Sequence, residues 1–178
     1  MAKNILLTGP PGCGKTTVTS RAVKILSDAG LTVGGLICPE IRVRGSRVGF
    51  GIADLLGGTG ILAHISDVPR DMPRVSRYRV NLPDLDRIAR IALERKADVL
   101  VIDEIGPMEL KSEVFKDSVL KALGSETPVI AAVHFRTNWG FIGRVKQRPD
   151  TKIVAVTQQN RDVLPSSIAR EVMSLLGR

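Results

Sequence analysis

The feature that most constrains this chain is the glycine-rich segment at residues 9–16, which reads Gly-Pro-Pro-Gly-Cys-Gly-Lys-Thr. It fits the spacing G-x-x-x-x-G-K-[ST], and it lies between an apolar run at residues 5–7 and a stretch with helical spacing of apolar residues. Glycines let successive backbone N–H groups turn toward one point, and the positive end of the following helix faces the same point. The segment is therefore typical of a loop that binds the phosphates of a nucleotide.

Two side chains of this loop indicate the chemistry of its ligand. Lys15 is placed to reach the outer phosphates as a point charge, and the hydroxyl of Thr16 is placed to ligate Mg²⁺. We therefore expect Mg²⁺ as the cofactor and nucleoside triphosphates as ligands. The loop residues expected to contact the nucleotide are Gly9, Pro10, Pro11, Gly12, Cys13, Gly14, Lys15, Thr16 and Thr17.

Length and composition favour an ordinary globular domain. The 178 residues are most simply one domain, 1–178, and 43% of them are hydrophobic. We see no signal peptide and no apolar run that approaches a membrane span, so we expect a cytoplasmic protein with no membrane partner. The net charge of +8 fits either a nucleic-acid partner or a site for polyanionic triphosphates. Aromatic residues make up 3% of the chain, which leaves few platforms for stacking of single-stranded bases.

Apolar patterns alternate between strand and helix along most of the chain. This alternation predicts an α/β fold with a doubly wound, mostly parallel sheet. Expected helices follow Asn81 and Ser112, each a capping residue, and residues 135–150 stay ambiguous between helix and loop. The expected strands include 31–38, 99–102, 128–133 and 153–156, and the remaining expected helices are 16–29 and 166–176.

Residues 38–65 interrupt this alternation. Two short segments, 41–44 and 47–50, are joined by Gly45-Ser46, a two-residue link typical of a β-hairpin. Strands at 52–56 and 61–65 extend the region, so we expect an antiparallel hairpin insertion around residues 38–65. The polar, arginine-rich segment 66–80 is predicted to be a mobile loop.

Two carboxylates end the apolar strand at 99–102. Asp103 stands where a phosphate-loop enzyme holds Mg²⁺, and Glu104 follows on the other side of the strand end, where it can activate a water molecule. Together they predict hydrolysis. In a doubly wound sheet, ligands bind at the carboxyl ends of the strands. The expected walls of the site are therefore the loops 9–16, 38–42, 103–109 and 134–139.

Several of these segments together resemble the thermophile and cancer-related nucleoside-triphosphatase family. They are the phosphate loop, Glu40-Ile41-Arg42 with Gly45, Arg47, Gly49 and Phe50, then residues 78–81, Asp-Glu-Ile-Gly-Pro-Met-Glu-Leu at 103–110, and Asn-Arg-Asp at 160–162. The resemblance implies a small RecA-like phosphate-loop fold. It also implies Mg²⁺-dependent hydrolysis of ATP, GTP, CTP, UTP and TTP to the diphosphate, with little base preference.

The same resemblance suggests roles for individual residues. Lys15 and Thr16 would hold phosphate and metal, Asp103 would hold metal, and Glu104 would act as the base. Arg42 is the candidate for an arginine that neutralises charge in the transition state, with Arg136 and Arg161 as competitors. Asn160 and Arg161 either contact the nucleoside or cap a helix. Glu109 either supports the site or caps the following turn.

Two other functions remain open from the sequence. A kinase that transfers the γ-phosphate to a nucleotide or a polynucleotide end is favoured by the arginine-rich segments 42–47 and 70–79. A nucleoside-triphosphate-dependent RNA-binding module is favoured by the net charge of +8. We expect the protein to be a monomer.

Overall fold

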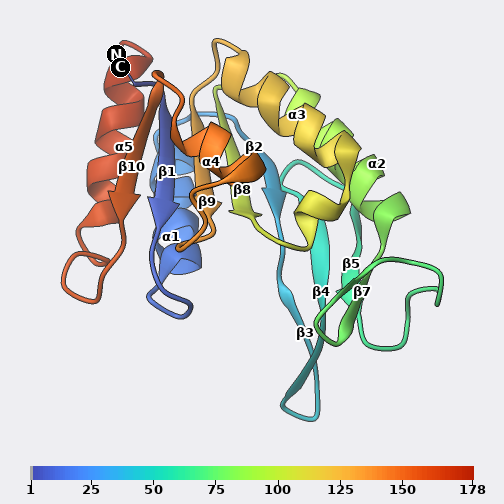
Figure 1. Ribbon diagram of the computed structural model, residues 1–178. Helices are drawn as coiled ribbons and strands as arrows, with labels where there is room; N and C mark the ends of the chain where they lie inside the picture. Colours follow the sequence, from blue (N-terminus) through green and yellow to red (C-terminus); the bar gives the residue numbers. More distant parts are fainter. Residues whose placement is uncertain (1) are drawn as a thin grey trace.

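The computed structural model describes residues 2–178, which form a sheet of ten strands covered by helices (Figure 1). The strand order is β10-β1-β9-β8-β2-β4-β5-β7-β6, and β3 pairs with β4 outside this path. The strands are β1 (Asn4–Thr8), β2 (Val33–Ile37), β3 (Glu40–Val43), β4 (Ser46–Asp54), β5 (Thr59–His64), β6 (Arg74–Val75), β7 (Tyr78–Val80), β8 (Val99–Ile105), β9 (Val129–Val133) and β10 (Thr151–Ala155).

The half of the sheet from β10 to β2 is parallel and has helices on both faces. Strands β1 and β9 are buried along their whole length, as expected for strands covered on both sides. Two hydrophobic cores result, one under α1 and α5 and one under α2, α3 and α4. This confirms the predicted fold class. The helices are α1 (Lys15–Asp28), α2 (Leu82–Glu94), α3 (Glu113–Gly124), α4 (Gly140–Lys146) and α5 (Leu164–Leu175).

The capping residues expected for two helices have that role in the structure. The Ser112 hydroxyl accepts a hydrogen bond from the Phe115 N–H at 2.8 Å, and the Asn81 side chain accepts one from the Asp84 N–H at 3.5 Å. Helix α4 resolves the ambiguous segment 135–150. Within residues 2–178, no helix is both long enough and apolar enough to cross a membrane.

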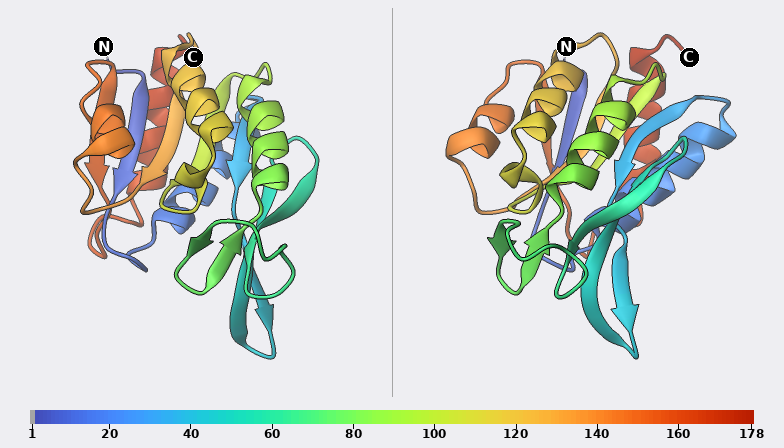
Figure 2. Two further views of the ribbon diagram at one scale, coloured as in Figure 1. Left: turned by 45° about the vertical axis from the view of Figure 1, so that its right-hand side comes forward. Right: turned by 90° about the vertical axis from the view of Figure 1, so that its right-hand side faces the viewer.

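The other half of the sheet is antiparallel and projects beyond the parallel half as a long arm formed by β3 and β4 (Figure 2). It is larger than expected, because it runs to Val80 rather than ending near residue 65. The predicted loop at 66–80 contains β6 and β7, and β7 pairs with β5. The prediction missed these strands because Tyr78 and Val80, which are buried, are isolated apolar residues in a polar segment.

The hairpin turn also differs from the prediction. Val43 pairs with Ser46, so the two turn residues are Arg44 and Gly45 rather than Gly45 and Ser46. Arg44 has φ 49° and Gly45 has φ 79°, and positive φ at both positions is typical of a type I′ turn. A register shift between Ile41 and Arg42 interrupts the simple alternation expected for this strand.

Candidate functional site

The phosphate loop connects β1 to α1 and has the conformation that its glycines permit. Gly12 and Gly14 have φ 75° and 110°, values that residues with side chains rarely adopt. At Gly9, a Cβ atom would lie 2.7 Å from the Val156 carbonyl oxygen, so this glycine allows the loop to pass close to β10. In the described chain, no side chain caps the start of α1, which leaves its first N–H groups available to an anion.

Lys15 folds back over this loop. Its Nζ donates hydrogen bonds to the carbonyl oxygens of Gly9 at 2.8 Å and Pro10 at 3.3 Å. The ammonium group therefore lies over the same loop whose N–H groups are available to phosphate. This arrangement supplies positive charge where the outer phosphates of a nucleotide would bind.

Thr16, in the first turn of α1, and Asp103, near the end of β8, bring together two oxygen donors from distant segments. The Thr16 hydroxyl donates a hydrogen bond to Asp103 Oδ1 at 3.3 Å, and the Cys38 N–H donates one to Asp103 Oδ2 at 3.1 Å. Burial raises the pKa of Asp103, while the Cys38 N–H, the Thr16 hydroxyl and Lys15 act in the opposite direction. A hydroxyl and a carboxylate beside an open cavity fit Mg²⁺, which takes one or two protein oxygens and completes its shell with phosphates and water.

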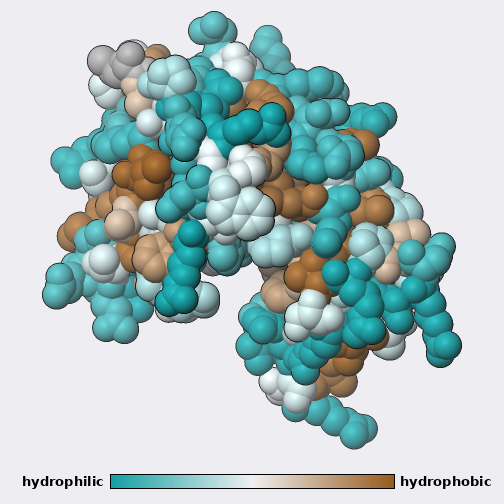
Figure 3. Space-filling view, in the orientation of Figure 1, coloured by the Kyte–Doolittle hydropathy of each residue, from teal (hydrophilic) through white to brown (hydrophobic). Residues whose placement is uncertain are grey.

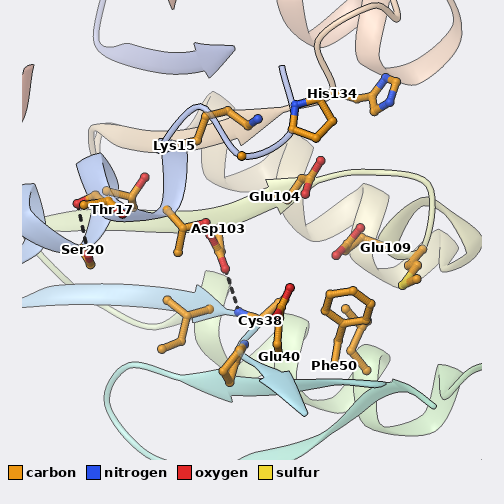
Figure 4. A pocket seen from close by; sticks show the side chains of 18 of the residues that line it. Lys15, Thr17, Ser20, Cys38, Glu40, Phe50, Asp103, Glu104, Glu109 and His134 are labelled. Atoms are coloured by element: carbon orange, nitrogen blue, oxygen red, sulfur yellow. Dashed lines mark hydrogen bonds between the residues drawn. The ribbon is translucent and has the colours of Figure 1, made fainter. Parts of the chain in front are cut away.

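Glu104 is the next residue of β8 and lines the same cavity. Figure 4 shows its carboxylate between Lys15 on one side and Glu109 on the other. Burial raises the pKa of Glu104, the Lys15 charge lowers it and Asp103 raises it. A half-buried carboxylate of raised pKa beside the phosphate loop is suited to accept a proton from an attacking nucleophile.

Glu109 is a third carboxylate of the cavity, and it is 5% exposed. It approaches Glu104 across Gly106, where an added Cβ would lie 3.1 Å from Glu109 Oε2 and 3.2 Å from Glu104 Cδ. Burial raises the pKa of Glu109 to about 8, and the charges of Glu104 and Asp103 add to the effect. Two roles were open for Glu109, support of the site or capping of the following turn. In the structure Glu109 lines the cavity and is also the first residue of the 3₁₀ turn Glu109–Lys111.

The cavity has a volume of about 860 Å³ and receives residues from all four predicted walls. It opens between the parallel half and the β3–β4 arm, where the space-filling view shows a hollow (Figure 3). The antiparallel strands form a further wall that was not predicted, because it depends on pairings between distant segments. The residues missed are Arg47, Phe50, Leu62 and Val75.

The candidate arginines lie outside the cavity. Arg42 forms an ion pair with Glu40, with 2.6 Å between Arg42 Nη2 and Glu40 Oε2. It also donates a hydrogen bond to the Gly45 carbonyl oxygen at 2.9 Å. Of the arginines in the described chain, Arg47 alone lines the cavity, so neither Arg42 nor Arg136 reaches it. The side chain of Arg161 packs against the phosphate loop, since its Cδ would lie 3.3 Å from a Cβ at Gly14.

Asn160 stabilises the turn after β10. Its side-chain oxygen accepts from the Thr157 N–H at 2.8 Å, and its amide nitrogen donates to the Ala155 carbonyl at 2.8 Å. The oxygen and the nitrogen of this amide thus each form a hydrogen bond within the turn. Together, Asn160 and Arg161 place the β10–α5 connection beside Gly14, on the side of the phosphate loop away from β8.

The sheet order, the phosphate loop and the acidic pair at the end of β8 define a phosphate-loop nucleotide-binding protein. A family model described as NTPase matches residues 4–169. The chain belongs to this nucleoside-triphosphatase family.

Full-length relatives agree with this assignment. The nucleoside-triphosphatase THEP1 of Thermofilum pendens is 46% identical, with 99% of each chain covered. THEP1 of Methanopyrus kandleri is 42% identical over 99% of this chain and 98% of its own. Among solved structures, a human cancer-related nucleoside triphosphatase has a TM-score of 0.85 at 32% identity, covering 97% of this chain and 98% of its own. THEP1 from Aquifex aeolicus has a TM-score of 0.74 at 30% identity, covering 95% and 98%.

Proposed function

We propose that this protein hydrolyses nucleoside 5′-triphosphates to the diphosphate and inorganic phosphate in a Mg²⁺-dependent reaction with broad base tolerance. One observation carries the proposal: Glu104 adjoins the Thr16–Asp103 oxygen pair in a cavity that also contains Lys15. The relatives named nucleoside-triphosphatase support triphosphate hydrolysis. Mg²⁺ is proposed because the two donors are a hydroxyl and a carboxylate.

Each protein group has a separate task. The N–H groups at the start of α1 and the Lys15 ammonium bind the outer phosphates. Thr16 and Asp103 hold the metal, which when bound neutralises charge on the phosphate oxygens. Glu104 accepts a proton from a water molecule as the water oxygen attacks the γ-phosphorus. The bond from the γ-phosphorus to the bridging oxygen breaks, and the diphosphate leaves.

Broad base tolerance follows from the surroundings of the expected nucleoside position. Asn160, the amide nearest the expected nucleoside position, is held to its own turn, with its oxygen accepting from the Thr157 N–H and one of its N–H groups donating to the Ala155 carbonyl. Arg161 offers a flat guanidinium on a stem that packs over Gly14. Such a surface supports any base by contact and favours none, so we propose ATP, GTP, CTP, UTP and TTP as substrates.

The proposal predicts slow turnover. Arg47, the arginine of the cavity wall, donates to Glu40 at 2.8 Å and to the Tyr78 hydroxyl at 3.2 Å. Arg42 is held by the same Glu40. In this structure both guanidiniums contact Glu40 and neither is preset on a transferring phosphoryl group, and such an arginine supplies about 10³–10⁵ in rate in related enzymes.

The test is release of inorganic phosphate from the five triphosphates with Mg²⁺ and then with excess chelator. We expect rates within about tenfold of one another across the bases, and loss of activity with the chelator. Phosphate release that persists in chelator would contradict the metal assignment. Release from one base alone would contradict broad tolerance.

A further inference from the structure

The part of the cavity beyond Glu104 has a different character from the phosphate loop. Its wall is mostly hydrocarbon, and it comes from the antiparallel strands and the segment after β8. We call this part the distal chamber. Its lining residues are Pro39, Phe50, Leu62, Val75 and Met108. Phosphate groups gain nothing from such surfaces, whereas an organic molecule buries apolar area against them.

The distal chamber lies on the side from which a nucleophile attacks. The strand order places these groups in sequence along the sheet. Arg161 follows the edge strand β10, and the phosphate loop follows β1. Glu104 lies near the end of β8, and beyond it Phe50 and Val75 lie on β4 and β6. In Figure 4, Thr17 and Phe50 lie at opposite ends, with Glu104 toward Phe50. In-line transfer requires the attacking oxygen opposite the leaving group. With the diphosphate held by the N–H groups at the start of α1, as proposed above, an in-line attacking group approaches from the chamber side.

The distal chamber offers apolar surface that a water molecule cannot use. The whole cavity, which also holds the site for the triphosphate, measures about 860 Å³, and an attacking water takes about 30 Å³ of it. The aromatic ring of Phe50 is held in place by the Tyr78 ring, with centroids 5.3 Å apart, and by the Arg47 guanidinium 5.1 Å from its centroid. A fixed aromatic side chain in a concave apolar wall is typical of a site for a flat organic group.

The charges of the chamber restrict what that group is. Glu104 and Glu109 face the interior, and Arg47, which lines the cavity, is already paired with Glu40 at 2.8 Å. A phosphorylated molecule would bring negative charge against the Glu104 carboxylate, and Arg47, the guanidinium that could offset it, already contacts Glu40. A neutral or cationic molecule meets no such cost.

We propose that the distal chamber binds a neutral or cationic organic alcohol with an aromatic or apolar body, as an acceptor for the γ-phosphoryl group. This rests on the proposed function, which supplies the triphosphate. The alcohol oxygen forms a bond to the γ-phosphorus, and its proton moves to Glu104. The bond to the bridging oxygen breaks, so the products are a phosphomonoester and the nucleoside diphosphate. Hydrolysis is then the reaction of water in the vacant chamber.

The first test uses purified protein with GTP, Mg²⁺ and one of three probes. Adenosine is neutral, 2-amino-1-phenylethanol is cationic, and AMP is adenosine with a negative charge added. Phosphomonoester, or ADP in the case of AMP, is separated from inorganic phosphate and quantified. We expect transfer to adenosine or to the amino alcohol, and about tenfold less transfer to AMP.

The outcomes separate the two proposals. Release of inorganic phosphate from GTP without any probe tests the proposed function alone. If that release occurs but no probe accepts phosphate or changes its rate, the acceptor proposal is overturned. Transfer to AMP that equals or exceeds transfer to adenosine would also overturn it, and would favour a nucleotide kinase.

A matched pair of variants locates the acceptor. Val75→Trp fills the chamber from β6, whereas Val43→Trp adds the same bulk at the arm, where Val43 is 54% exposed and outside the cavity. We expect the ratio of transferred to released phosphate to fall about tenfold in Val75→Trp and to stay unchanged in Val43→Trp. Equal ratios in a folded Val75→Trp protein, checked by circular dichroism, would place the acceptor elsewhere. If Val75→Trp does not fold, the probe series on the unaltered chain still decides the proposal.

Discussion

The two halves of the sheet contribute differently to the site. The parallel half supplies the polar groups of the site: Lys15 and Thr16 at the start of α1, and Asp103 and Glu104 near the end of β8. The antiparallel half supplies Phe50, Leu62 and Val75, which give the cavity shape and apolar surface. The comparison indicates that the parallel half binds the phosphates, and that the antiparallel half determines which molecule can approach the γ-phosphate. The following predictions test this division, beginning with the largest expected effect.

Replacement of Lys15 tests the contribution of the parallel half to phosphate binding. Lys15→Ala is expected to lower phosphate release by about 10²–10³-fold, because the outer phosphates lose their fixed positive charge. Lys24→Ala is the matched control, since Lys24 is an exposed residue of α1 paired with Asp28 at 2.9 Å. Comparable losses in both variants would contradict a specific role for Lys15. Steady-state assays with Mg·ATP provide the measurement.

The junction of the two halves depends on Gly35 in β2, the strand that joins β8 to β4. A Cβ at Gly35 would lie 2.0 Å from the Val101 carbonyl oxygen, and its φ is 111°. We expect Gly35→Ala to lower the free energy of unfolding by more than about 4 kcal/mol. Gly57→Ala is the control, with φ 130° but open space around it, and should cost about 1–2 kcal/mol. Urea unfolding distinguishes the two, and equal losses would show that the close approach is unimportant.

Glu109, a buried wall residue of the cavity after β8, makes stability depend on pH. Its pKa is raised to about 8 in the folded protein by burial. Between an unfolded pKa of about 4.5 and that value, the folded state keeps a proton that the unfolded state loses. The free energy of unfolding therefore falls as pH rises through this window. Glu109→Gln removes the titration, so we expect its stability relative to the wild type to increase from pH 5 to pH 8. A constant difference across this range would contradict the assignment.

The smallest expected effect is a difference in melting temperature between variants of Arg47 and Arg42. Both pair with Glu40, but Arg47 also contacts the Phe50 ring and the Tyr78 hydroxyl. Arg47→Ala is expected to lower the melting temperature by about 2–4 °C. Arg42→Ala should change it by less than about 1 °C, because exposed ion pairs contribute little. A larger loss in Arg42→Ala would show that the arm, rather than the chamber wall, depends on these arginines.

The parallel half of the site is predicted from the sequence, whereas much of the antiparallel half is not. The phosphate loop and the acidic pair were predicted because each is a short motif at a strand end, and strand ends of a parallel sheet converge on one edge. All four predicted walls line the cavity. The strands β6 and β7 were missed, because Tyr78 and Val80 are isolated apolar residues in a polar segment, and β7 joins the sheet by pairing with β5, where Val80 lies opposite Ala63.

The arginines show a second limit. Arg42 and Arg47 are partners across the hairpin and both pair with Glu40, but a register shift between Ile41 and Arg42 interrupts the alternation of the strand, and Arg47 rather than Arg42 lines the cavity. Spacing alone does not encode such a shift. Asn160 is similar, since its two hydrogen bonds depend on the three-dimensional course of the turn after β10.

The central claim is that Glu104 accepts the proton of the attacking group next to phosphates held by the parallel half. The most direct measurement compares phosphate release and nucleotide binding in Glu104→Gln with those in Glu113→Gln, an exposed glutamate at the start of α3. We predict a loss of at least about 100-fold in phosphate release for Glu104→Gln with nucleotide affinity retained, and no change in the control. An unchanged rate of phosphate release in Glu104→Gln would contradict the account.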